Sequence, residues 1–172
     1  MRIKYIVGRF LLMIPIINKK QFVYEMLGVH KMAPKGRFFI GNPKLVGDYR
    51  FLHMGENSEI ERNCFILAKD RIEIGENSTI AYGVTVLTGA DPNGPKNWLS
   101  QLYPPVKAPV IIGRDCWIGA NSTLLPGVTV GDKSVVAAGS VVIRDVPSGV
   151  MVAGNPAAIK KHLSIVEKTI HS

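Results

Sequence analysis

The sequence predicts an all-β fold, a left-handed parallel β-helix built from triangular coils. Three observations predict it: an aliphatic residue at every sixth position, a small or β-branched residue four positions further on, and Gly or Asn in the turns. A period of six fits neither an α-helix, at 3.6 residues per turn, nor a long strand with alternating side chains. It fits short strands joined by tight turns, three of which close one coil, with successive coils paired in parallel about 4.8 Å apart.

The repeat lies on both sides of one interruption. After the interruption the aliphatic positions follow without a slip, at Ile112, Ile118, Leu124, Val130, Val136 and Val142. Before it they are Met54, Ile60 and Ile66 and, after a slip of two residues, Ile74, Ile80 and Val86. We expect these side chains to point into the prism. The corner positions four residues further on are Ser58, Cys64, Ser78, Val84, Cys116, Ser122, Val128, Ser134, Ser140 and Val146.

A chain of 172 residues with 47% hydrophobic content suffices for one buried core, so we expect a single domain. We divide it into an N-terminal helical segment (1–33), a β-helix (34–153) with a projecting loop (88–108), and a C-terminal helical tail (154–172). Gly28 is a plausible helix stop, and Ile159, Leu163 and Val166 have helical spacing. A terminal helix would also cover the unpaired strand edges at the open end of the coils.

The first residues, "MRIKYIVGRFLLMIPII", are basic and then apolar. Arg9 interrupts the apolar run, and no small-residue cleavage site follows, so the segment does not meet the criteria for a signal peptide. It is also too short and too charged to span a bilayer. Two interpretations stay open: an amphipathic helix packed on the first coil around Phe38 and Phe39, which we prefer, or peripheral contact with an anionic membrane.

The net charge of +8 favours an anionic partner, for which nucleic acid, a phosphorylated cofactor and an anionic membrane are all candidates. Nucleic acid is disfavoured, because the sequence contains no recognised binding module and no basic stripe interleaved with aromatic residues. The two cysteines, Cys64 and Cys116, form no CxxC motif or ligand cluster. We therefore expect both to be structural, and a cytoplasmic location is the default.

Two segments resemble the hexapeptide-repeat acyltransferases, especially the maltose and galactoside O-acetyltransferases. They are "APVIIGRDCWIGANSTLLPGVTVGDKSVVAAGSVVIRDVPSGVMVAGNPAAIKK" (108–161) and "NCFILAKDRIEIGENSTIAYGVTVLT" (63–88). The resemblance implies a homotrimer of β-helical prisms that uses acetyl-CoA, with active sites in the clefts between neighbouring subunits. It also implies that residues 88–108 reach the adjacent subunit; a regular solenoid has no packing reason to eject such a loop.

The resemblance also assigns candidate catalytic residues. The family uses a His as general base for a hydroxyl acceptor, and this His closes a segment that here reads Thr88, Gly89, Ala90, Asp91. The expected base is therefore Asp91; an ordinary carboxylate, with a pKa near ~3.9, matches this task less well than His, near ~6.5. Asn63 falls at the family's catalytic-site asparagine, and it is also typical of a turn in a coil corner.

The same resemblance implies a coenzyme site. Trp117 matches a tryptophan that lines the coenzyme or acceptor cleft, although an outward Trp is also typical of subunit packing. Ala120 and Ala138 match small positions along the pantetheine arm. Lys161 matches a basic residue near the 3′-phosphate, and Lys160 is a candidate to compensate for an Arg that is missing at Ala158. A Thr of the family is replaced by Ile143.

The sequence thus predicts an acyl-CoA-dependent O- or N-acetyltransferase that acts on a sugar or a related small acceptor. The alternative is a catalytically impaired relative that binds coenzyme A or a glycan, because Asp91 replaces the usual His. A zinc carbonic anhydrase on the same fold needs three His ligands. Only His53 lies within the coils, so we expect no metal.

Overall fold

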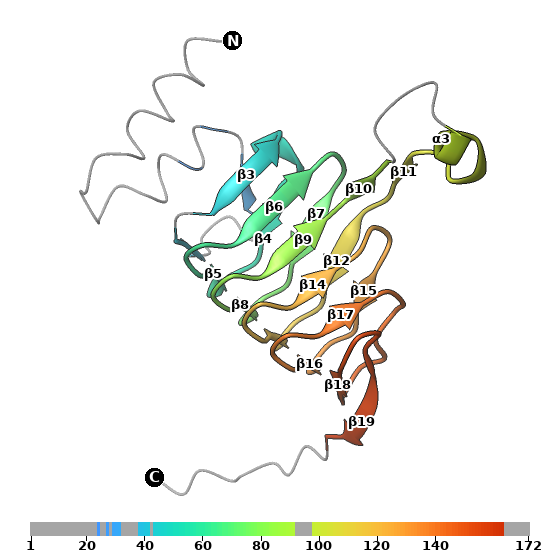
Figure 1. Cartoon of the computed structure of the whole chain (residues 1–172). Helices are drawn as coiled ribbons and strands as arrows, with labels where there is room; N and C mark the ends of the chain where they lie inside the picture. The colour runs from blue at the N-terminus through green and yellow to red at the C-terminus, as the bar shows by residue number, and fades with distance from the viewer. Residues whose placement is uncertain are drawn as a thin grey trace, which may run out of the picture.

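The structure is a computed structural model that describes residues 24, 27, 29–31, 38–41, 43–91 and 98–163. The described chain winds through three parallel sheets, and each third strand returns to the same sheet (Figure 1). Sheet 1 contains β1 (His30–Lys31), β4 (Leu52–Met54), β7 (Ile72–Ile74), β12 (Val110–Ile112) and β15 (Thr129–Val130). This is the predicted left-handed parallel β-helix.

The other two sheets complete the triangle. Sheet 2 contains β2 (Phe38–Ile40), β5 (Ser58–Ile60), β8 (Thr79–Ile80), β13 (Trp117–Ile118), β16 (Val135–Val136), β18 (Val150–Ala153) and β19 (Ala158–His162). Sheet 3 contains β3 (Lys44–Gly47), β6 (Phe65–Ala68), β9 (Thr85–Leu87), β14 (Thr123–Leu124) and β17 (Val141–Val142). We name the corners by the sheets that they join along the chain: corner 1/2, corner 2/3 and corner 3/1. A 3₁₀ helix, η2 (Tyr49–Phe51), lies at corner 3/1 of the first coil.

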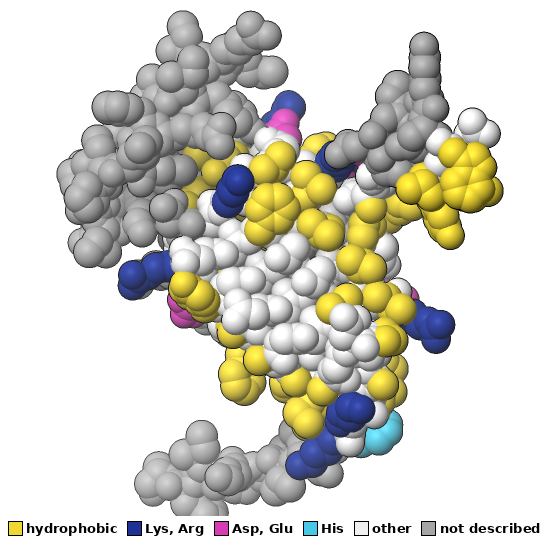
Figure 2. Space-filling model, in the orientation of Figure 1, with side chains coloured by type: hydrophobic (Ala, Val, Ile, Leu, Met, Phe, Trp, Pro, Cys, Tyr) yellow, Lys and Arg dark blue, Asp and Glu magenta, His cyan; other side chains and the backbone are white. Residues whose placement is uncertain are grey.

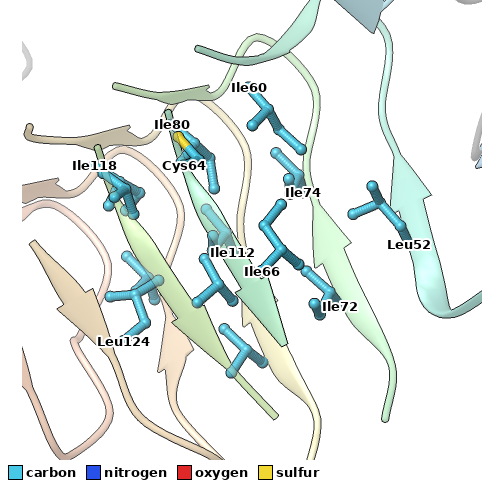
Figure 3. Close-up of a cluster of buried hydrophobic side chains, with 14 of the residues drawn as sticks. Leu52, Ile60, Cys64, Ile66, Ile72, Ile74, Ile80, Ile112, Ile118 and Leu124 are labelled. Carbon is cyan, nitrogen blue, oxygen red and sulfur yellow. The ribbon is translucent and has the colours of Figure 1, made fainter. Parts of the chain in front are cut away.

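The core is a stack of aliphatic side chains inside the prism (Figure 3). Every side chain that the six-residue period places inward is at most 1% exposed, from Met54 to Val142. The strands pair so that these positions coincide: Ile74 lies opposite Ile112, and Ile80 opposite Ile118. The slip of two residues falls at Lys69 and Asp70, between β6 and β7, where the turn is longer.

Corner 1/2 is built from a column of left-handed turn residues. Asn57, Asn77, Asp115 and Lys133 have φ between 53° and 58°. Short polar side chains, here those of Asn57, Asn77 and Asp115, tolerate this conformation better than most other non-glycine residues. The Asn77 side chain links the column, because its Oδ1 accepts from Asn57 Nδ2 and its Nδ2 donates to Asp115 Oδ1, both at 3.2 Å.

Described residues that precede the coils belong to the buried core. Tyr24 and Leu27 have helical backbone and are buried, and the Tyr24 hydroxyl donates to the carbonyl of Gly41 at 3.2 Å. These two residues support packing on the first coil; residues 1–23, 25, 26, 28, 32 and 33 of the predicted helical segment lie outside the described residues. The coils begin earlier than the predicted boundary at residue 34, since β1 (His30–Lys31) pairs in parallel with β4.

The prediction of a helical tail is wrong for Ala158–His162. These residues form β19, which turns back and pairs antiparallel with β18. The outer edge of β18 would otherwise leave its backbone N–H and C=O groups unpaired, and a returning strand satisfies them. This gain outweighs the helical spacing of Ile159 and Leu163. Residues 164–172 of the predicted tail lie outside the described residues.

Candidate active site

An arm leaves the prism at corner 3/1, between β9 and β12 (Figure 1). Its two ends, β10 (Gly89–Ala90) and β11 (Val106–Lys107), pair antiparallel. At its base, the backbone N–H of Ala108 donates to the carbonyl of Thr88 at 3.2 Å. The excursion therefore occupies the residues at which the loop is predicted. Residues 92–97 lie outside the described part.

The described outer part of the arm is apolar and exposed. It contains α3 (Trp98–Leu102), which has no buried residue. The exposed fractions of Trp98 and Tyr103 are 69% and 67%. Figure 2 shows hydrophobic side chains gathered there, well away from the body of the prism. Such a segment is suited to contact with another surface.

Asp91 lies at the root of the arm, directly after β10. Its Oδ2 forms an ion pair with Lys69 Nζ at 2.9 Å. The Asp91 side chain is 26% exposed and that of Lys69 is 45% exposed, so water still reaches both charges. Lys69 stands on the preceding coil, at the same corner. The structure therefore places a paired carboxylate at the position for which a catalytic base is predicted.

Thr88 and Gly89 explain why this corner is well defined. Thr88 is fully buried; its Oγ1 donates to the carbonyl of Leu67 and accepts from the backbone N–H groups of Lys69 and Asp70, at 2.7 to 2.9 Å. A Cβ at Gly89 would lie 2.6 Å from Cδ of Lys69. Glycine at this position therefore leaves room for the Lys69 side chain to pass beneath the arm toward Asp91.

Asn63 lies at corner 2/3, at the other end of the sheet 3 strands from Asp91. It is exposed, has φ of 58°, and donates from Nδ2 to the Tyr82 hydroxyl. The turn role expected of Asn63 is therefore present. Within one chain the structure does not bring Asn63 and Asp91 together, because β6 and β9 separate their corners.

Trp117 and Lys161 share one outward row on sheet 2. Trp117 on β13 is 59% exposed and pairs with Val135, Val135 pairs with Met151, and Met151 pairs with Lys161 on β19. Lys160 lies at a register shift between Lys161 and Ile159. Both lysines are exposed, so the row runs from an aromatic side chain to a pair of positive charges.

On the other side of Trp117 the same row contains an acidic residue. Glu59 on β5 lies opposite Thr79, which lies opposite Trp117. Partial burial raises the pKa of Glu59 above its ordinary value, and the neighbouring Glu61 carboxylate adds to this shift. An anionic ligand on sheet 2 is therefore attracted toward β19 and repelled from β5.

Ala120 and Ala138 lie beside this row, in consecutive turns at corner 2/3. The backbone N–H of Gly139 donates to the carbonyl of Ala120 at 2.8 Å, which stacks the two turns. Ala138 is exposed and Ala120 half-buried. The predicted coenzyme-contacting residues Trp117, Ala120, Ala138, Lys160 and Lys161 are thus brought to one side of the prism, around the second half of sheet 2.

Sheet 3 presents an apolar row on its outer face. Val46, Leu67 and Leu87 lie opposite one another on β3, β6 and β9. Leu125 and Ile143 continue the row directly after the paired positions of β14 and β17. In Figure 2, which views this face, hydrophobic side chains gather over β6 and β9. This row and the apolar arm are both available for subunit contacts.

Neither cysteine is suited to nucleophilic chemistry. Cys64 and Cys116 are free and buried, and burial raises the pKa of both thiols. A buried thiol with a raised pKa is a poor nucleophile. Among the described residues, no group of three or more His, Cys, Asp and Glu side chains could hold a metal ion.

Comparison with known proteins identifies the family. Residues 109–144 match the family model described as "Hexapeptide repeat of succinyl-transferase". The chain is 36% identical to "Putative acetyltransferase YJL218W" of Saccharomyces cerevisiae over 153 residues, which are 88% of this chain and 74% of the relative. The chain belongs to the hexapeptide-repeat acetyltransferases.

This hexapeptide-repeat acetyltransferase also matches other relatives over smaller shares of its length. It is 34% identical to galactoside O-acetyltransferase of Escherichia coli over 68% of this chain and 57% of that protein. It is 60% identical to a 2,3,4,5-tetrahydropyridine-2,6-dicarboxylate N-acetyltransferase of Clostridium perfringens over 40% of this chain and 28% of that protein.

Solved structures agree with the family over most of the chain. A maltose O-acetyltransferase from Clostridium difficile 630 has a TM-score of 0.79 and 28% identity, covering 95% of this chain and 86% of that one. The acetyltransferase VCA0836 from Vibrio cholerae, complexed with acetyl coenzyme A, has a TM-score of 0.75 and 25% identity, covering 94% and 85%. The predicted resemblance to maltose and galactoside O-acetyltransferases is confirmed.

Two side chains beside the candidate catalytic residues were not predicted. Lys69 pairs with Asp91, and Tyr82 accepts from Asn63. Each stands one coil away from its partner, 22 and 19 residues along the chain. The sequence did contain a signal for Lys69. The two-residue slip places Lys69 in the turn at corner 3/1, and Asp91 lies at the same corner one coil later.

Proposed function

We propose that this hexapeptide-repeat acetyltransferase transfers the acetyl group of acetyl-CoA to a hydroxyl or amino group of a sugar or a related small molecule. The observation that carries the proposal is the row on sheet 2 that runs from Trp117 to Lys161. An aromatic side chain, small corner residues and a pair of positive charges suit a long ligand with an apolar arm and a phosphorylated end. The relatives named for maltose and galactoside support a sugar acceptor.

We propose the orientation of acetyl-CoA on sheet 2 from the positions of the positively charged side chains. Lys160 and Lys161 on β19 would hold phosphate groups through charge-assisted hydrogen bonds. The narrow turns at Ala120 and Ala138 would let the uncharged part of the coenzyme lie close to the backbone. Trp117 is the bulky outward side chain at the far end of this path and would contact the coenzyme or the acceptor.

We propose a homotrimer with active sites between chains. Asp91 and Asn63 lie at different corners of one prism, so a site that uses both needs residues of two chains. The exposed apolar arm and the apolar row on sheet 3 are surfaces that a neighbouring chain would bury. In such an assembly Asp91 of one chain would serve as proton acceptor, and Asn63 of the next would contact the acyl group or the acceptor.

The compartment we propose is the cytoplasm. Both cysteines are free thiols, which suits a reducing environment. No helix in the described part of the chain is long and apolar enough to cross a membrane.

The proposal is tested by measuring thiol release from acetyl-CoA with a panel of sugars and amino sugars, and coenzyme A binding by calorimetry. We expect turnover with at least one acceptor. Replacing both Lys160 and Lys161 by Ala should raise the KM for acetyl-CoA about tenfold, because charge-assisted hydrogen bonds are lost, and leave kcat nearly unchanged. Lys133→Ala, at corner 1/2, is the control. Coenzyme A binding without turnover of any acceptor would instead indicate a catalytically impaired relative.

A further inference from the structure

We infer that the reacting group of the acceptor is an amine, selected by the Lys69–Asp91 pair at the root of the arm. The inference rests on the proposed acetyl transfer and names the acceptor chemistry of that same site. It treats Asp91 as a catalytic residue that touches the reacting nitrogen. Lys69 is a positioning residue that acts through Asp91.

The pair is built into the corner from several directions. Lys69 Nζ lies 2.9 Å from Asp91 Oδ2, the absence of a side chain at Gly89 makes room for the Lys69 stem, and Thr88 Oγ1 holds the backbone of Lys69. An ion-paired carboxylate is ionised, so it accepts hydrogen bonds and carries no proton of its own. A carboxylate has about four acceptor sites, so contact with Lys69 is compatible with a hydrogen bond from a substrate.

No imidazole stands in for the carboxylate in the described part of the molecule. His30 and His53 lie opposite each other on sheet 1, and His162 lies on β19 at the end of sheet 2. His53 lies opposite Glu73, and Ile111 lies opposite Glu73 on its other side, so this row does not bring His53 to Asp91. Asp91 is therefore the carboxylate at the position predicted for the base, and Lys69 is the cation paired with it.

A carboxylate is poorly matched to a hydroxyl acceptor. An alcohol is a very weak acid, comparable to water, and its proton must leave as oxygen attacks the thioester. The pKa of an ordinary carboxylic acid, about 3.9, lies far below that of an alcohol. An imidazole narrows this gap by about 2.6 units. A carboxylate that also forms an ion pair is therefore a less suitable general base for this step than an imidazole.

An amine acceptor does not need a base that removes its proton as it attacks the thioester. The neutral amine attacks with its lone pair, so a C–N bond forms while the electrons of the C=O bond move to the thioester oxygen. The tetrahedral species re-forms the carbonyl and breaks the C–S bond, and sulfur leaves as a thiolate. The nitrogen, now positively charged, gives one proton to Asp91, and Asp91 passes it to the thiolate, whose pKa near ~8.5 makes this transfer favourable. The products are an amide and free coenzyme A.

The same carboxylate also suits binding. Most amines are protonated near neutral pH, and a carboxylate accepts a strong charge-assisted hydrogen bond from an ammonium. Lys69 holds the Asp91 carboxylate in one orientation, which lowers the cost of ordering it when the acceptor binds. The site thus favours an acceptor that arrives as an ammonium over its neutral hydroxyl counterpart. The ammonium gives its first proton to solvent, which reaches the partly exposed pair, before the neutral amine attacks.

The test compares matched acceptors on the full-length protein: glucosamine with glucose, and galactosamine with galactose. Thiol release from acetyl-CoA measures turnover, and hydroxylamine treatment distinguishes the products, because it cleaves esters and leaves amides intact. We expect amides and no esters. Ester formation at a comparable rate overturns the inference and leaves the proposed acetyl transfer standing. No thiol release with any acceptor, although coenzyme A binds, overturns the proposed function and the inference with it.

Substitutions of Asp91 and Lys69 test the role of each residue separately. Asp91→Asn keeps the shape and should lower kcat with the amine about 100-fold, with an unchanged KM for acetyl-CoA. Asp91→His should gain ester formation. Glu76→Gln, the same chemical change at corner 1/2, should leave activity unchanged. Lys69→Met should lower kcat, and Lys69→Arg should restore most of it, with equal unfolding midpoints for both variants. If Asp91→Asn retains full amine turnover, Asp91 has no role in the reaction and the inference fails.

Discussion

At the scale of single residues, the corner positions show how one slot accepts different side chains. Ser78, Cys116 and Ser134 occupy the same position at corner 1/2 of successive coils. Ser78 Oγ donates to the carbonyl of Gly113 at 2.7 Å, and Cys116 Sγ donates to that of Gly131 at 3.1 Å. In these coils the slot holds a small side chain that donates a hydrogen bond to the next coil, so we expect the donor to matter as well as the size.

The hydrogen bond from Cys116 Sγ predicts different stabilities for two substitutions of Cys116. Cys116→Ser should change the free energy of unfolding by less than about 1 kcal/mol, because the hydroxyl makes the bond that Ser78 makes. Cys116→Val fills the slot without a donor and should cost about 1 kcal/mol or more. Urea denaturation at one protein concentration measures both. Equal stability of the two variants would mean that the slot selects for size only.

At the scale of elements, the turns decide where the chain can bend between sheets. Gly47, at the end of β3, and Gly139, at corner 2/3, both have positive φ, of 120° and 69°. Their surroundings differ. A Cβ at Gly47 would lie 2.1 Å from the carbonyl oxygen of Ala68, whereas nothing lies within 4 Å of a Cβ at Gly139. Gly47 is therefore needed both for its conformation and for the close approach of the next coil.

The two glycines provide a matched pair of substitutions to alanine. Gly139→Ala should cost about 1 to 2 kcal/mol, the expense of a left-handed conformation alone. Gly47→Ala adds a collision with backbone that cannot move aside, so we expect a loss of about 3 kcal/mol or more. Thermal and urea unfolding of both variants gives the difference. A cost at Gly47 no larger than that at Gly139 would show that β3 shifts to make room.

At the scale of the whole molecule, the exposed apolar arm is the main departure from a closed solenoid. Leu99 on α3 is 47% exposed, and Ile159 on β19 is exposed to the same extent. Only Leu99 belongs to a helix, α3, in which neighbouring apolar side chains, those of Trp98 and Leu102, are also exposed (Figure 1). A homotrimer would bury this segment and would leave isolated surface residues unaffected.

Leu99→Asp should therefore lower the mass measured by analytical ultracentrifugation from three chains of 18.8 kDa toward one. Ile159→Asp, the control, should retain the larger mass. Circular dichroism should show the same β content for both, because α3 contributes no buried residue to the core. A wild-type chain that sediments as a monomer would contradict the proposed assembly.

Much of the fold could be predicted because its information is local and repeated. Each inward residue from Met54 to Val142 follows from a period that any single coil already displays, and the small corner residues mark the bends. The helical tail was the error. Ile159 and Leu163 carry helical spacing, but the open edge of β18, which no local pattern records, pairs with Ala158–His162 instead.

The candidate site could also be predicted only in part from the sequence. The position of the arm was predicted from the sequence, and Asp91, Asn63, Trp117 and Lys161 were proposed as site residues from its resemblance to a family. Their grouping was not, because it depends on which coil lies above which. The structure places Trp117 and Lys161 in one row and separates Asp91 from Asn63.

By itself, the sequence determined the solenoid, the inward residues, the place of the arm and the absence of histidine at its root, because each is a property of residue type and spacing. Only the tertiary structure decided that Lys69 faces Asp91, since the two residues stand 22 positions apart and meet when the second and third coils stack. Coil stacking brings residues that are far apart in the sequence into contact, and backbone pairing between the strands of each sheet sets which residues meet. The chemistry at the root of the arm therefore belongs to a pair of residues and not to Asp91 alone.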